Sequence, residues 1–140
     1  MAGVHAVVVH HVLRASLDPV LHDLRLTNGP VPKLSESPVL DEVDDFGDVQ
    51  IAGVWLGGQG GGRTGVTVMT SSDEAYRIYR VADQVQDWAI EELWPGSPTN
   101  WPPCPTHPDS HPLVAEMLGE AAVWMCPRDA TAIAPIGQLT

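Results

Sequence analysis

The sequence predicts a small α+β domain with N-terminal helices, a β-hairpin, one long amphipathic helix and a proline-rich C-terminal segment. Three observations predict it: two strand-like runs around a glycine-rich stretch, strong helical periodicity after them, and a change of composition near residue 97. A chain of 140 residues has the length of one domain, and folding buries about two-thirds of its surface. We therefore divide it into an α+β body, residues 1–96, and a C-terminal segment, residues 97–140, packed on that body.

The net charge of −11, with only seven lysines and arginines, describes an acidic protein. Such a protein repels phosphate backbones and anionic lipid, so we expect neither nucleic acid nor membrane surfaces among its partners. The first residues contain no basic leader, and histidines interrupt their apolar run, which indicates a cytoplasmic protein without an export signal. In a reducing compartment the two cysteines are metal ligands or plain thiols rather than a disulfide.

The N-terminal third is predicted to be helical. Residues 4–14 fit either a helix or a strand, and we favour the helix. Asp18 and Pro19 predict a second helix start, which ends at residues 27–30. Prolines at 30, 32 and 38 prevent a continuous element over residues 31–48. Five acids fall between Asp41 and Asp48 without the ligand order of a calcium loop, so the stretch predicts a solvated acidic loop. Four histidines are interpreted as partly exposed helix residues: His5, His10, His11 and His22.

Residues 49–56 and 65–70 alternate between apolar and polar positions and predict two strands. A helix over about residues 73–94 follows, with a capping box formed by Ser71 and Glu74. Its apolar stripe repeats every three or four residues and contains Ile78, Val81, Ala82, Val85, Trp88, Ala89 and Leu93.

The stretch from Gly57 to Thr64, GGQGGGRT, is close to the phosphate-binding pattern G-x-x-x-x-G-K-[ST]. A phosphate loop works at the start of a helix, where backbone amides surround the phosphate. Here a strand-like run follows, and Arg63 stands at the lysine position. We therefore interpret the stretch as the tip of a β-hairpin and expect no nucleotide.

The C-terminal segment contains two similar turns, C-P-T-H from Cys104 to His107 and C-P-R-D from Cys126 to Asp129. They resemble the paired knuckles of a zinc ribbon, so the predicted segment is zinc-ribbon-like. The resemblance implies that backbone amides face each thiolate and that Cys104, His107 and Cys126 bind zinc. For the fourth ligand we favour His111, with Asp129 as the alternative.

A Cys₂His₂ set fills all four positions of a tetrahedral ion, so the zinc would be structural, and no catalytic residue is predicted. The alternative is that both cysteines are small buried apolar side chains and both histidines lie in surface turns. Trp88 is expected in the core, and Trp101 and Trp124 over the metal turns. Alternatively, Trp94 and the Trp101–Pro103 stretch form an exposed surface for a partner.

The same tail is similar to that of small uncharacterised proteins of actinobacteria and their phages. The similarity rests on W-P-x-C-P-x-H-P and H-P-L within residues 101–113, V-W-x-C-P at 123–127 and I-G-x-L at 136–139. This group implies an origin but no activity.

The sequence predicts a non-enzymatic binding or assembly protein with protein partners or self-association. More specifically, we expect a connector or minor structural protein of a phage-like virion, located in the cytoplasm or in the virion. The alternative is a small metal- or cysteine-dependent enzyme that uses Cys104, His107, His111 and Cys126.

Overall fold

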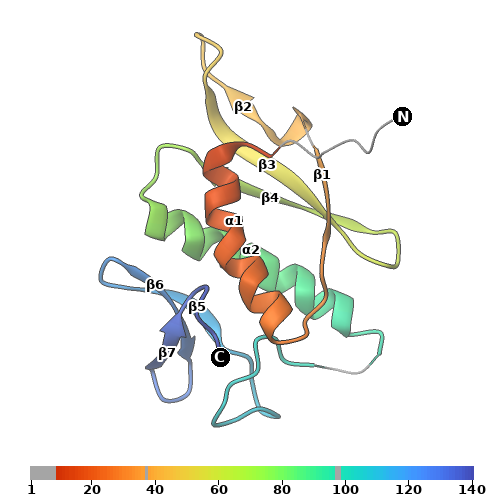
Figure 1. Cartoon of the computed structure of the whole chain (residues 1–140), viewed down its shortest axis with the longest axis vertical. Coiled ribbons are helices and arrows are strands. Elements are labelled where there is room, and N and C mark those ends of the chain that lie inside the picture. The colour runs from red at the N-terminus through yellow and green to blue at the C-terminus, as the bar shows by residue number, and fades with distance from the viewer. Residues whose placement is uncertain (1–8, 37, 97–98) are drawn as a thin grey trace.

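The computed structural model describes residues 9–36, 38–96 and 99–140, which form two helices and two antiparallel sheets (Figure 1). The fold is therefore the predicted α+β class. Helix α1 (His11–Leu26) comes first and α2 (Glu74–Leu93) separates the sheets. The first sheet contains β1 (Lys33–Glu36), β2 (Glu42–Val43), β3 (Val49–Gly57) and β4 (Arg63–Met69). The second contains β5 (Val114–Leu118), β6 (Ala121–Cys126) and β7 (Thr131–Pro135).

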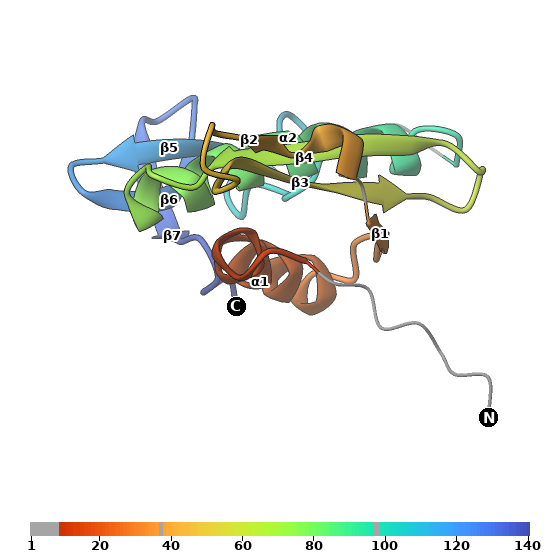
Figure 2. The same cartoon turned by 90° about the horizontal axis from the view of Figure 1, so that it is seen from above.

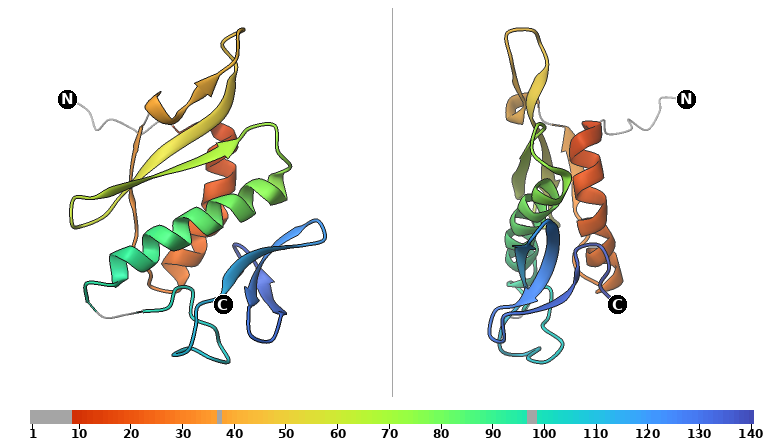
Figure 3. Two further views of the ribbon diagram at one scale, coloured as in Figure 1. Left: turned by 180° about the vertical axis from the view of Figure 1, so that it is seen from behind. Right: turned by 90° about the vertical axis from the view of Figure 1, so that its left-hand side faces the viewer.

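The molecule has two layers (Figure 2 and Figure 3). In one layer α2 lies between the two sheets and contacts β4 on one side and β5 and β6 on the other. Helix α1 forms the second layer and covers one side only. A single cluster of buried apolar side chains includes residues from α1, from both sheets and from α2, because each element has only one apolar face to bury.

The predicted hairpin and long helix are confirmed. β3 pairs with β4 from Ile51–Met69 to Gly57–Arg63, and the glycine-rich stretch forms the tip between them. A strand rather than a helix follows this tip, so the geometry of a phosphate loop is not formed. The guanidinium carbon of Arg63 instead lies 4.3 Å from the ring centroid of Trp55. The core of the α2 stripe is buried, and Trp88 belongs to it as predicted.

Three local predictions are wrong. The capping box is not formed, because α2 begins at Glu74 behind Asp73, whose side chain makes no capping bond. Residues 31–48 are not only a loop: they contain β1, the 3₁₀ turn η1 (Pro38–Leu40) and β2, which pair with or pack on β3. Tertiary packing on an existing strand overrides the poor strand propensity of such a stretch.

The predicted break at Pro19 is also wrong, because α1 continues through it from His11 to Leu26. A proline inside a helix costs about 3 kcal/mol. Each buried leucine or valine contributes about 1.5–3 kcal/mol, so the apolar face of α1 outweighs that cost. This face contains Leu13, Leu17, Val20, Leu21 and Leu24. The start of the residue 4–14 prediction and His5 lie outside the described residues, whereas residues 11–14 are helical as predicted.

A buried carboxyl group, Asp23 of α1, joins the first helix to the end of the chain. Its Oδ2 accepts hydrogen bonds from Trp124 Nε1 at 2.8 Å and from the backbone amide of Gly137 at 2.6 Å. Its Oδ1 accepts one from the amide of Leu139 at 3.1 Å. Gly137 has a φ of +99°, and a Cβ there would lie 2.8 Å from that of Pro19, so only glycine fits. Two backbone amides of the I-G-x-L sequence, those of Gly137 and Leu139, thus donate to the buried carboxylate of Asp23.

Replacing this carboxyl group should destabilise the protein strongly. We expect Asp23→Ala to lower the free energy of unfolding by about 2–4 kcal/mol, because buried donors on Trp124, Gly137 and Leu139 lose their acceptor. Asp18→Ala is the matched control on the same helix: Asp18 is exposed, and we expect a change of at most about 1 kcal/mol. Urea denaturation of both variants measures the difference. Equal stability of the two would contradict the role of Asp23.

Candidate metal centre

Four side chains from three turns of the C-terminal segment meet at one point. Cys104 and His107 belong to a turn in which the His107 amide donates to the Cys104 carbonyl. His111 stands before Leu113, whose amide donates to the Pro102 carbonyl and closes the loop. Cys126 is the last residue of β6. These are the four residues that the sequence predicts as zinc ligands, and their placement fits a zinc-ribbon-like segment.

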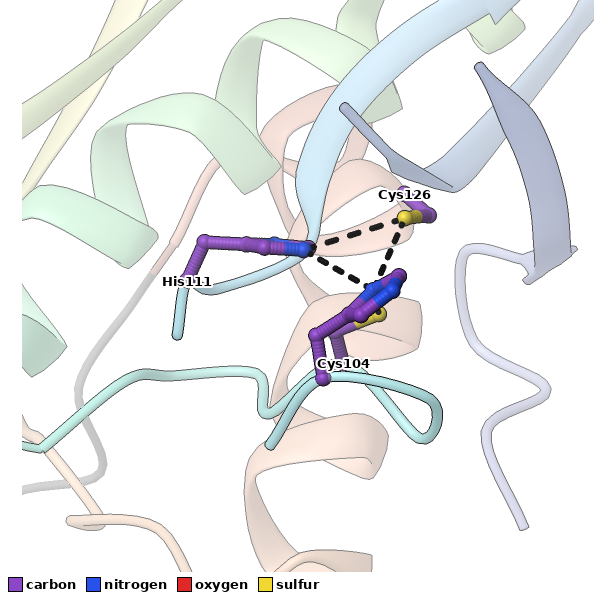
Figure 4. Close-up of side chains that lie close together, drawn as sticks. Cys104, His111 and Cys126 are labelled. Carbon is purple, nitrogen blue, oxygen red and sulfur yellow. Dashed lines mark hydrogen bonds between the residues drawn. The ribbon is translucent and has the colours of Figure 1, made fainter. Parts of the chain in front are cut away.

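The donor atoms of the cluster lie within 4.8 Å of one another (Figure 4). His107 Nδ1 is 3.6 Å from both Cys104 Sγ and Cys126 Sγ, and 3.1 Å from His111 Nε2. His111 Nε2 is 3.8 Å from Cys126 Sγ. Both cysteines are free and buried, and both histidines are half-buried. The cluster can therefore hold a metal ion with two sulfur and two nitrogen donors.

The histidine rings are held in orientations that leave one nitrogen free for the cluster. His111 Nδ1 donates a proton to the Pro112 carbonyl at 2.9 Å, so Nε2, which faces the cluster, carries the lone pair. His107 uses Nδ1 toward the cluster, while its Nε2 lies 3.8 Å from Asp129 Oδ2. With a metal bound, the Asp129 carboxylate would favour the tautomer with the proton on Nε2, whereas without metal Nδ1–H can donate to the thiolate of Cys104.

The cysteines have the environment that the knuckle resemblance implies. The Asp129 amide points at Cys126 Sγ at 3.5 Å. Cys104 Sγ lies 3.3 Å from Thr106 Oγ1 and 3.6 Å from His107 Nδ1, and the backbone amides of Thr106 and His107 favour its thiolate. Burial raises the pKa of the Cys104 thiol, but the hydrogen bonds from Thr106 and His107 outweigh it and lower the pKa to about 6. The thiolate that binds metals is thus favoured at neutral pH.

The alternative fourth ligand, Asp129, does not belong to the cluster of four. Its side chain lies behind His107 and is half exposed, and its contribution to the turn comes from its amide. His10 and His22 are also remote from the cluster. His10 Nδ1 accepts from the Val12 amide at the start of α1, and His22 lies beside Asp23.

Trp101 and Trp124 join the C-terminal segment to α1 and its C-terminal cap. Both are buried, and their rings meet edge to face with centroids 5.5 Å apart. Trp101 Nε1 donates to Thr27 Oγ1 at 2.9 Å, as Trp124 Nε1 does to Asp23. The interpretation of Trp101 as an exposed partner surface is therefore wrong, whereas Trp94 is exposed.

Sequence reasoning missed a buried amide that holds the base of the metal loop. Gln86 Nε2 on α2 donates to the carbonyls of Trp101, at 3.0 Å, and of Leu113. These two residues stand at the two ends of the loop that carries Cys104, His107 and His111. A signal was present, because Gln86 is polar yet stands four residues after Ala82 on the apolar stripe.

No protein-family model matches this chain, and the comparisons with curated proteins and with solved structures find no match either. Among the described residues, neither helix is long and apolar enough to cross a membrane. The origin that the tail suggests therefore stays a prediction.

The pKa of Cys104 predicts a measurable titration in metal-free protein. The thiolate absorbance that Cys104→Ser removes should appear with a midpoint near pH 6, because the group is a thiol below its pKa and a thiolate above it. An unfolded cysteine has a pKa of about 8.5. The hydrogen bonds to the thiolate therefore stabilise the fold fully above that pH, and their contribution is lost as the pH falls toward 6. A folded-state midpoint near that of unfolded protein would contradict the arrangement.

Proposed function

We propose that this chain is a non-enzymatic binding or assembly protein whose Cys104, His107, His111 and Cys126 hold one structural zinc ion. The observation that carries the proposal is the spacing of the four donors. In a tetrahedral zinc site with bonds of about 2.3 Å to sulfur and 2.0–2.1 Å to nitrogen, a sulfur and a nitrogen lie about 3.6 Å apart, and two nitrogens about 3.3 Å. Here His107 Nδ1 lies 3.6 Å from each sulfur and His111 Nε2 lies 3.8 Å from Cys126 Sγ. The two nitrogens lie 3.1 Å apart.

The donor set supports zinc over other metals. Calcium and magnesium take oxygen ligands, and none of the four donors is oxygen. A two-iron cluster with two cysteines and two histidines places each pair on a different iron. Here each cysteine lies within 3.6 Å of His107 Nδ1, so the donors surround a single point. Thiolate and imidazole together are the usual ligands of structural zinc.

The closed donor set supports a structural role. Catalytic zinc keeps one position for water or substrate, whereas four protein donors would leave none. The loop around Cys104 and His107 contains no helix or strand, only a bridge between Pro103 and Pro112. A metal bond is a strong link for such a loop, because its binding free energy becomes folding free energy.

The surface supports a binding or assembly role. Two aromatic side chains are exposed: Phe46 is 91% exposed in the β2–β3 turn, and Trp94 is 62% exposed directly after α2. Exposed aromatic residues of this size are typical of interaction sites. A connector or minor structural protein of a phage-like particle, in the cytoplasm or virion, is the specific form that the tail resemblance favours.

The lowered pKa of Cys104 favours a second candidate, a cysteine-dependent enzyme. Against it stands the burial of the thiol, since Cys104 is fully buried and no substrate carbon can approach its sulfur. A hydrolytic metal site would need an open coordination position, which a fourth protein donor occupies. The binding role is therefore the better-supported proposal.

Zinc content tests the proposal directly. Untagged protein purified under reducing conditions should contain about one zinc per chain, and Cys104→Ser should abolish binding because it removes a thiolate. His111→Ala should weaken binding by about tenfold to a hundredfold or more, since the remaining three donors admit water. Elemental analysis and a competitive zinc chelator measure both.

Asp129→Asn and His22→Ala are the matched controls, and both should retain about one zinc per chain. If Asp129→Asn loses the metal while His111→Ala keeps it, the fourth ligand is Asp129 and the closed site described above is wrong. Metal-free protein that is as stable as the zinc-loaded form would contradict a structural metal altogether.

A further inference from the structure

A cavity opens on the side of the molecule that α1 leaves uncovered. It has a volume of about 270 Å³ and lies between β3, β4 and the first turns of α2. In β3 and β4 the side chains of Ala52, Val54, Val66 and Val68 are buried in the core, whereas Ile51, Thr67 and Met69 alternate to the other side. Figure 2 and Figure 3 show α1 only on the core side of this layer. Val68 and Ser72 also line the cavity, and the remaining wall comes from Tyr76, Arg77 and Arg80 of α2.

Arg77 is a positive charge without a counterion. Its Nη1 donates to the carbonyl of Ser72 and, at 3.5 Å, to that of Thr70, which fixes the guanidinium in the wall of the cavity. Its Nε is buried and has no hydrogen-bond partner. Among the described residues no carboxylate forms an ion pair with it, although Asp73 and Glu74 stand one turn earlier. A partly buried cation without a negatively charged partner is unfavourable, so an anion in the cavity would stabilise it.

The second arginine is also available. Arg80 lies 4.0 Å from Asp83, and both side chains are about half exposed, so this ion pair contributes little. The chain has only seven lysines and arginines and a net charge of −11. Two of these seven cations line a single small cavity. The local positive charge thus contrasts with the acidic protein around it and selects anionic groups.

We infer that this cavity receives a carboxylate side chain from an acidic, apolar segment of a partner protein. The two guanidinium groups match a carboxylate, while Ile51, Met69 and the ring of Tyr76 give its surroundings an apolar character. Met69 is 58% and Tyr76 45% exposed beside the cavity, and Met, Tyr and Arg are enriched at protein interfaces. The volume of about 270 Å³ has room for one inserted carboxylate side chain.

This inference rests on the proposed binding role but not on the metal, so the two can fail separately. The test uses zinc-loaded protein of measured metal content and pools of acetylated, amidated hexapeptides with one Glu next to Phe or Leu. Identical pools with Gln in place of Glu are the control probe. Binding is followed by NMR through the Nε–Hε signals of the arginines, which report directly on Arg77 and Arg80.

The Glu peptides should bind and shift the signals of Arg77 and Arg80, and added salt should weaken the binding. Arg80→Gln should reduce affinity at least about tenfold, the loss expected for a charge-assisted hydrogen bond. Arg25→Gln is the matched control, because Arg25 is exposed near the end of α1 in the other layer, and it should leave affinity unchanged. Arg77→Lys tests the fixed guanidinium if Arg77→Gln does not fold.

Several outcomes would overturn the inference. Equal binding of the Gln and Glu peptides would show that the carboxylate charge is not recognised. Unchanged affinity in both Arg80→Gln and Arg77→Lys would show that the peptides do not bind in this cavity. Binding of hexanoate or inorganic phosphate but not of the peptides would make the cavity a small-anion site. Arginine shifts that appear only with increasing protein concentration would identify a second copy of the chain as the occupant.

Discussion

The convergence of two thiols and two imidazoles on one point is the constraint on which the C-terminal third depends. Between Trp101 and Leu113 the backbone forms no helix or strand, so side-chain links must define its course. Gln86 fixes the two ends of this loop to α2, and the proposed zinc would fix its middle to the end of β6. Asp23 then joins the second sheet and the chain terminus to α1. The contacts of Gln86 and Asp23, together with the proposed metal site, would replace the regular hydrogen bonding that prolines prevent.

The proposed metal site and the proposed docking cavity lie in different parts of the molecule. The cluster and the Asp23 contact lie on elements that α1 helps to bury, whereas the uncovered side of β3, β4 and α2 presents a cationic cavity among exposed apolar residues. A closed metal site makes a loop rigid without offering a reactive position. Rigid support behind an exposed surface lowers the entropy lost on binding, which is consistent with the proposed role as a binding protein.

The sequence pattern predicted those features of the structure that depend on residues close together in the chain. The alternation in β3 and β4 and the stripe of α2 gave their positions within two residues, because each buries one face against the core. The two C-P-x turns placed Cys104, His107 and Cys126 correctly, since a turn of four residues determines its own geometry. The choice of His111 rather than Asp129 as the fourth residue of the cluster depended on how the loop closes. Gln86 on α2 and the bridge between Pro103 and Pro112 determine that closure. The strands at residues 33–43 and the partners of Asp23 arise from contacts distant in sequence, which no local pattern contains.

X-ray absorption at the zinc edge of the purified protein tests the central claim most directly, because it counts the donor atoms around the metal. A closed site should show two sulfur donors at about 2.3 Å and two nitrogen donors at about 2.0–2.1 Å, with imidazole scattering from both histidines. A shell with one sulfur, with a carboxylate or water oxygen in place of a histidine, or with nitrogen and oxygen donors only would contradict a closed site built from Cys104, His107, His111 and Cys126.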